Sequence, residues 1–299
     1  MKLFTFLATL TVTALAGCAS HKNAPEQSAP LPDTEFRVES VVVYTPADWP
    51  EPLQADIYVP KRKGSGPGVM LVHGGGWERR SRDDMTWIAE ELAGRGFVVM
   101  NIDYRFAPEY TFPSQLYDLQ LAMNWLHSRA DTYGLERDAI GAFGFSSGAH
   151  LVSLMALVAD TGHPLNEPHG GAKARPVAVV AGGLPADLRA FGSGKLIRQF
   201  LGGEQSEIPE VYETASPITH ITASAPPFFL FHGGMDMLVP VTQAESFRAE
   251  LNEHQVENEL YLMHLRGHVT SFLTAGTVLD EAADFLIRHT RQEQQALKD

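Results

Sequence analysis

The segment AIGAFGFSSGAHLVSL, residues 139–154, changes character at its centre. It begins as a short apolar run, passes through GFSSG at residues 144–148, and continues with apolar residues at helical spacing. A strand that turns into a helix within three residues strains the backbone at the turn and leaves no room for side chains two positions away on either side. The segment therefore predicts a strand, a sharp turn that exposes the hydroxyl of Ser146, and a helix.

Short apolar runs alternate with helical patterns on both sides of this segment. We expect strands at 38–44, 53–59, 68–72, 97–102, 140–145, 177–181, 228–231 and 260–265, and helices near 84–94, 113–130, 147–158, 241–254 and 270–289. Such alternation predicts one α/β domain, with a mostly parallel central sheet covered by helices on both faces. The longest irregular stretch, 182–227, mixes glycine, proline and charged residues, offers no long hydrophobic face, and is expected to form at most short helices at the rim of the site.

Chemically active residues follow four of the expected strands. A glycine-rich loop, HGGGW, occupies residues 73–77, and Ser146, Asp236 and His268 each come shortly after another apolar run. Ligands bind at the carboxyl ends of the strands in sheets of this type. We therefore expect these four features to form one site there.

These residue types suit acyl transfer. A free serine is a weak nucleophile, and an imidazole that a carboxylate holds in the correct tautomer can take its proton. Ser146, Asp236 and His268 occur in the chain order described for α/β-hydrolases. The backbone N–H groups of Gly75, Gly76 and Ser147 are candidates for binding the oxyanion, and the sequence does not decide which glycine pair serves.

Several motifs together resemble those of a known family. They are HGGGW (73–77), DYRFAPE (103–109), GFSSGAHL (144–151), SPI (216–218), HGGMDMLVP (232–240) and GH (267–268). In this order they resemble the α/β-hydrolase carboxylesterases, and more closely the hormone-sensitive-lipase-like and xylan/feruloyl esterase groups. The resemblance implies an α/β-hydrolase fold and hydrolysis of short-chain, aryl or sugar esters through an acyl-enzyme, without a cofactor. Only strand-like sequence precedes the glycine loop, whereas hormone-sensitive-lipase-like enzymes usually carry a helical cap there, so we expect little or no cap domain.

Some assignments have rivals in the sequence. His264 lies inside a strand-like alternation and is a less suitable base than His268, and Asp280, on the last expected helix, is a less suitable acid than Asp236. His150 is expected to pack or form hydrogen bonds near Ser146. Trp77 either lines the acyl pocket or packs in the core. Two alternative functions remain open. The chain is then either an amide-directed hydrolase of the exopeptidase or arylformamidase type, or a noncatalytic envelope module.

Composition narrows the range of partners. The 299 residues carry a net charge of −13 and no block of lysine or arginine, which argues against nucleic acid as a partner. No spacing typical of a metal site and no phosphate-binding loop with a lysine occurs. We expect a small-molecule ester as substrate and neither metal nor organic cofactor. The sequence leaves the oligomeric state open.

The first residues resemble an export signal. An apolar run at 3–16 is followed by Leu15-Ala16-Gly17-Cys18, which resembles a bacterial lipoprotein signal in which the cysteine becomes the lipidated first residue. We expect a signal peptide at 1–17, a flexible tether at 18–34 and the catalytic domain at 35–299. Lipidation at Cys18, the only cysteine, implies attachment to a membrane of the cell envelope, by analogy the outer membrane, with the leaflet left open.

Overall fold

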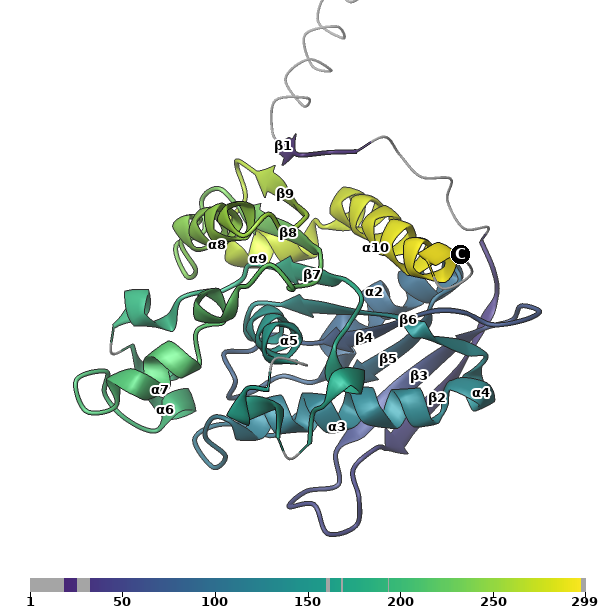
Figure 1. Cartoon of the computed structure of the whole chain (residues 1–299), viewed down its shortest axis with the longest axis horizontal. Coiled ribbons are helices and arrows are strands. Elements are labelled where there is room, and N and C mark those ends of the chain that lie inside the picture. Colours follow the sequence, from purple (N-terminus) through teal and green to yellow (C-terminus); the bar gives the residue numbers. More distant parts are fainter. Residues whose placement is uncertain (1–18, 26–32, 160–161, 168, 193, 297–299) are drawn as a thin grey trace, which may run out of the picture.

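A computed structural model describes residues 19–25, 33–159, 162–167, 169–192 and 194–296. Within these residues nine strands form one sheet, in the order β1-β9-β8-β7-β6-β4-β5-β3-β2 (Figure 1). The strands are β1 (Ala19–Lys22), β2 (Phe36–Val43), β3 (Gln54–Pro60), β4 (Gly66–Val72), β5 (Val98–Ile102), β6 (Leu135–Phe145), β7 (Val179–Gly182), β8 (Phe228–Gly233) and β9 (Asn258–Met263). The six strands from β4 to β9 are parallel, and β1, β2 and β3 pair antiparallel at the two edges. The expected mostly parallel sheet is confirmed.

Helices cover both faces of the sheet, because its central strands are apolar on both sides. Along β4, Val69 and Leu71 pack into one hydrophobic cluster with α2 (Thr86–Gly94) and α10 (Gly276–Ala296). Met70 and Val72 point the other way, into a cluster formed with α3, α5 and α8. Figure 1 shows α10 and α3 on opposite sides of the sheet. The bounds of the second group are α3 (Ser114–Ser128), α5 (Ser147–Val158) and α8 (Thr242–Glu253).

The helix expected at 270–289 is instead two helices, α9 (His268–Leu273) and α10. The apolar spacing continues across the break at Thr274 and Ala275, so periodicity alone did not reveal it. The stretch at 182–227 forms short helices, as expected, at α6 (Lys195–Leu201) and α7 (Pro209–Thr214). A further short helix, α4 (Ala130–Tyr133), follows α3. None of the described helices is long and apolar enough to span a bilayer.

The start of the expected tether is a strand rather than a flexible segment. β1 pairs antiparallel with β9, and the Nε2 atom of His21 lies 2.8 Å from the Oε2 atom of Glu259. The ring of His21 also packs against those of Phe229 and Tyr261. Composition did not predict this strand, because the neighbouring strand supplies its hydrogen bonds and contacts. Cys18, residues 1–17 and residues 26–32 lie outside the described residues.

Candidate active site

Ser146 occupies the turn that the sequence predicts between β6 and α5. Its backbone has φ 55° and ψ −120°, a strained conformation for a residue with a side chain. A Cβ atom on Gly144 would lie 2.3 Å from the carbonyl oxygen of Gly148, and one on Gly148 would lie 2.2 Å from that of Val72. Both flanking positions therefore require glycine, and the turn lifts the serine side chain to the carboxyl edge of the sheet.

The three residues expected to act together lie within hydrogen-bond distance. The Oγ atom of Ser146 is 2.9 Å from Nε2 of His268, and Nδ1 of His268 is 2.6 Å from Oδ2 of Asp236. Asp236 follows β8, and His268 begins α9 after the turn that leaves β9. This geometry allows the imidazole to take the serine proton while the carboxylate holds the ring.

The carboxylate of Asp236 is fixed by several contacts. Its Oδ1 atom accepts hydrogen bonds from the backbone N–H groups of Leu238 and Val239, at 2.9 and 2.8 Å. Burial opposes ionisation, but the hydrogen bonds from His268 and Val239 outweigh it and hold the pKa of Asp236 below its ordinary value. Asp236 is therefore ionised at neutral pH. Buried His232 donates from Nε2 to the carbonyl oxygen of Val239 at 2.8 Å and so braces this loop.

The candidate oxyanion site lies beside Ser146. Gly75, Gly76 and Ser146 line the same pocket, and Ser147 is the first residue of α5. In the described part of the chain, no acceptor takes the backbone N–H of Gly75, Gly76 or Ser147. These donors remain available to an oxygen atom on a substrate, and the choice between the two glycines stays open.

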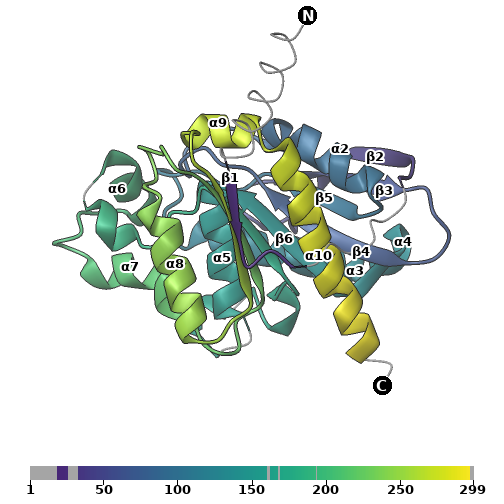
Figure 2. The same ribbon diagram turned by 90° about the horizontal axis from the view of Figure 1, so that it is seen from above.

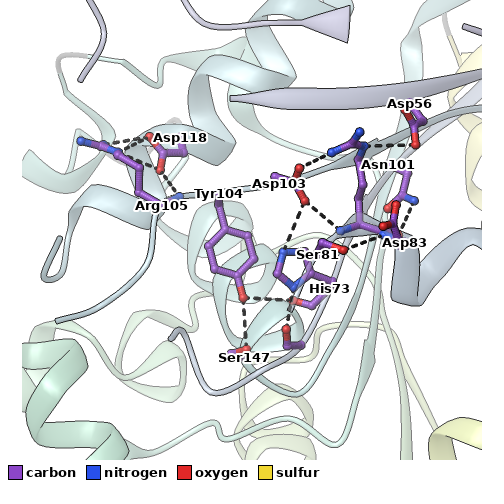
Figure 3. A network of polar contacts seen from close by, with 12 residues as sticks. Asp56, His73, Ser81, Asp83, Asn101, Asp103, Tyr104, Arg105, Asp118 and Ser147 are labelled. Atoms are coloured by element: carbon purple, nitrogen blue, oxygen red, sulfur yellow. Dashed lines mark hydrogen bonds and ion pairs between the residues drawn. The ribbon is translucent and has the colours of Figure 1, made fainter. Parts of the chain in front are cut away.

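Tyr104 links the glycine loop to the start of α5 (Figure 3). Its hydroxyl donates to the carbonyl oxygen of His73 at 3.1 Å and lies 3.2 Å from Oγ of Ser147. Nδ1 of His73 in turn donates to the carbonyl oxygen of Gly74 at 2.6 Å. Burial raises the pKa of Tyr104, so the phenol stays protonated and remains a donor. This contact holds the two candidate parts of the oxyanion site together.

Arg105, the next residue of the DYRFAPE motif, lies away from this brace. Its Nε atom donates to Oδ1 of the buried Asp118 at 2.9 Å, and its guanidinium lies 4.8 Å from the ring centre of Trp49. The nearby Asp103 instead pairs with Arg82. Figure 3 shows Asp103 and Arg105 on opposite sides of Tyr104. The motif therefore fixes two different loops rather than one.

Trp77 belongs mainly to the core. Its side chain is 3 % exposed, and its ring stacks on Phe200 with 4.5 Å between centroids. Its Nε1 atom donates to Nδ1 of His150 at 3.3 Å, and Nε2 of His150 donates to the carbonyl oxygen of Ala215 at 2.7 Å. Of the two roles expected for Trp77, core packing dominates, and only part of the residue borders the pocket.

Acid is expected to destabilise the fold through His150. Burial lowers its pKa to about 4, while an unfolded histidine titrates near 6.5. Between these values the unfolded chain binds a proton that the folded chain does not, so this contribution to stability is full above pH of about 6.5 and falls as pH decreases. The free energy of unfolding should decrease by about 1 kcal/mol per pH unit from this residue. Urea unfolding at a series of pH values measures the slope, and an equal slope in the His150→Gln variant would contradict the assignment.

An apolar pocket of about 510 Å³ opens beside Ser146 and His268. Its apolar lining comes from the loops after the strands, from α9 and from the rim stretch, and includes Phe145, Leu238, Val269, Phe272, Leu273, Phe191, Leu196 and Ile197. The rim stretch at 182–227 was expected to offer no long hydrophobic face. It nevertheless supplies Leu196 and Ile197 from α6 and Phe191 from the 3₁₀ turn Leu188–Phe191 that precedes this helix.

The sequence analysis did not identify Gly183 as a neighbour of His268, and it placed His264, the alternative candidate for the base, inside a strand. Gly183, which has φ 56°, follows β7, and a Cβ atom there would lie 2.9 Å from Cε1 of His268. The rule that strand ends line the site would have found it. His264 is exposed in the turn after β9, not inside the strand, so its removal should cost little stability. Among the described residues, no three His, Cys, Asp or Glu side chains gather as a metal site would require.

Comparison with known proteins was made on both sequence and structure. The sequence model of one family, BD-FAE, matches residues 55–251. "Esterase LipC" of Mycobacterium tuberculosis is 33% identical over 189 residues, which are 60% of this chain and 47% of that protein. The chain spans about half the length of this and two other curated relatives.

Solved structures share the fold. A truncated carbohydrate esterase from gut microbiota superposes with a TM-score of 0.78 at 22% identity, covering 88% of this chain and all 100% of the other. A propionate-bound esterase of Thermogutta terrifontis has a TM-score of 0.69 at 25% identity, covering 88% and 96% of the two chains. These likenesses confirm the expected α/β-hydrolase fold.

Proposed function

Because the chain belongs to the BD-FAE family, we propose that it is a serine carboxylic ester hydrolase whose catalytic residues are Ser146, His268 and Asp236. One observation carries the proposal. Two consecutive hydrogen bonds, of 2.9 and 2.6 Å, connect the serine hydroxyl through the imidazole to the carboxylate at the mouth of an apolar pocket. One of the relatives is named an esterase, and this name supports the same activity.

The first half of the reaction forms an acyl-enzyme. Nε2 of His268 takes the proton of Ser146 as the serine oxygen bonds to the carbonyl carbon, whose oxygen gains the electron pair of the C=O bond. The N–H groups of Ser147 and of Gly75 or Gly76 bind this oxyanion. The electron pair on the oxyanion then re-forms the C=O bond, and the bond from the acyl carbon to the alcohol oxygen breaks. His268 gives its proton to this departing oxygen.

Water then hydrolyses the acyl-enzyme by the same sequence of proton transfers. His268 takes a proton from a water molecule that attacks the acyl carbon, and the second oxyanion occupies the same N–H groups. When this intermediate collapses, the bond to Ser146 breaks and the serine recovers its proton from His268. Asp236, which is ionised at neutral pH, stabilises the charged imidazolium in both halves.

The substrates are esters with short or aromatic acyl groups, including aryl and sugar esters. The pocket lies within the usual size range of small-molecule sites and is lined mainly by apolar side chains. The propionate bound to the Thermogutta terrifontis esterase supports a short acyl group.

Acyl-chain length tests this assignment. On nitrophenyl esters, kcat/KM is expected to peak at about two to four acyl carbons, because longer chains leave apolar surface in water and gain little from binding. The series from acetate to laurate is measured in detergent-free buffer. A maximum at about twelve carbons, with activation at an oil surface, would place the protein among lipases instead.

We also propose that the chain is exported and attached by lipid at Cys18 to the cell envelope. The support is the sequence Leu15-Ala16-Gly17-Cys18 after an apolar run. Changing Cys18 to serine is expected to abolish incorporation of labelled fatty acid, because the thiol that carries the lipid is gone. Unchanged labelling of the Cys18→Ser chain in the producing cells would refute lipid attachment at this residue.

A further inference from the structure

Large apolar side chains are exposed around the mouth of the pocket. Met237 is 95% exposed, Leu265 64% and Leu273 68%. The full set, named here the apolar rim, is Met235, Met237, Leu238, Leu265, Val269 and Leu273. Among the described residues, the other exposed large apolar side chains are three valines of β2, at the opposite edge of the sheet. A concentration of this kind on one face commonly marks an interaction surface.

The apolar rim is continuous because its two loops pack on each other. The backbone N–H of Met235, in the loop after β8, donates to the carbonyl oxygen of Arg266 at 2.9 Å. The N–H of Gly234 donates to that of Met263 at 2.8 Å. Leu265 therefore lies next to the loop that carries Met237, and α9 continues the same face beyond His268.

The chain enters the fold beside this rim. β1 is antiparallel to β9, and its first residue, Ala19, is paired with Met263, two residues before Leu265 (Figure 2). The ion pairs from Glu259 to His21 and Arg288 hold this strand in place. Cys18, which the proposed export makes the first residue and the carrier of the lipid, directly precedes Ala19 in the sequence, so the lipid attaches next to the end of β1 that lies beside the rim.

Basic side chains surround the same mouth, although the chain has a net charge of −13. The side chains of Arg79 and Arg80, on the pocket lining, are 70% and 62% exposed, and each lies near one carboxylate, Glu78 at 3.7 Å and Asp84 at 3.6 Å. Lys195 borders the pocket as well. Arg266 is exposed beside Leu265. Cations at the edge of an apolar surface match anionic headgroups above an acyl layer.

We propose that the apolar rim docks on the surface of an anionic lipid bilayer, so that the pocket opens toward the membrane. β1 begins beside the rim, at the residue that follows the proposed lipid-bearing Cys18, and the rim side chains enter the outermost apolar layer of the bilayer. The catalytic site then meets substrates at the membrane face. Docking does not depend on the proposed ester hydrolysis, and it specifies which face of the domain the membrane contacts.

Fluorescent labels at single positions test this docking. Met237→Cys and Leu265→Cys, neither of which lines the pocket, are each labelled with an environment-sensitive dye in the full chain as the cell processes it. Val43→Cys, on β2 and 48% exposed, is the matched control, and the unsubstituted chain gives the background from Cys18. Each is added to vesicles of phosphatidylethanolamine and phosphatidylglycerol that carry a shallow nitroxide quencher. The dyes at 237 and 265 are expected to be quenched about twofold, and the dye at 43 to be unaffected.

Two outcomes overturn the proposal. Equal, weak quenching at all three positions would show that the rim stays in water. If the rim dyes instead report an apolar environment in the absence of vesicles as the protein concentration rises, two copies of the chain bury the rim against each other. Circular dichroism establishes that each labelled chain is folded, and the second rim position tests docking if the first variant does not fold. Turnover of soluble nitrophenyl acetate is measured in the same samples. Quenching without turnover would refute the proposed hydrolysis and leave docking intact.

Discussion

Replacing Ser146 with alanine is expected to lower kcat for ester hydrolysis by at least about 10⁴-fold. The substitution removes the oxygen that forms the acyl-enzyme and leaves the pocket and the candidate oxyanion donors in place. The fold should persist, because alanine keeps the Cβ atom at φ 55° and the substitution removes the hydrogen bond to His268, which lies at the mouth of the pocket. Initial rates on nitrophenyl acetate, together with thermal unfolding of both proteins, measure the two effects.

Ser147 provides the matched control. Its hydroxyl lies 3.2 Å from that of Tyr104, and its proposed role uses the backbone N–H, which alanine retains. Ser147→Ala should therefore keep kcat within about tenfold of the parent value. A fluorophosphonate probe should label the parent and Ser147→Ala but not Ser146→Ala. If the probe labelled Ser146→Ala instead, or the folded parent resisted it, Ser146 would not be the nucleophile.

Local sequence predicted the parts of the site whose geometry is set by short segments. The turn at Ser146 follows from two glycines at which a Cβ atom would lie only 2.2 to 2.3 Å from a backbone carbonyl oxygen. Asp236 and His268 were found by one rule, that loops at the carboxyl ends of parallel strands converge. The same rule applied to β7 points to Gly183, which packs against His268. The convergence of these loops follows from the sheet order.

Features that depend on distant partners were not predictable in this way. The sequence of β1 has little strand propensity of its own. It forms a strand because its backbone pairs with β9 and the side chain of His21 contacts that of Glu259. The partner of Arg105 is Asp118, 13 residues away on α3, and no spacing in the motif identifies it. The sequence did not indicate the break between α9 and α10, because apolar residues occur at helical spacing on both sides of it. Those of α9 belong to the apolar rim, and those of α10 belong to the core.

Replacing Asp236 with asparagine is expected to lower kcat by about 10³- to 10⁴-fold while leaving the domain folded. In the parent, Oδ1 of this residue accepts two backbone N–H groups, so the asparagine oxygen should keep that position. The NH₂ group then replaces the oxygen that faces Nδ1 of His268 and donates to it. The imidazole is thereby held with its proton on Nε2, the atom that must accept the serine proton. Steady-state kinetics at neutral pH measures the loss.

Asp280 supplies the control for the loss of one negative charge. Its side chain is 65% exposed on α10 and pairs with Arg95 at the surface, far along the chain from β8. Asp280→Asn should therefore leave kcat within about twofold, since exposed ion pairs contribute little. Burst kinetics separate the two roles of the carboxylate, because a tautomer defect slows formation of the acyl-enzyme itself and abolishes the burst. A folded Asp236→Asn chain with a normal burst and normal kcat would mean that His268 is oriented without Asp236.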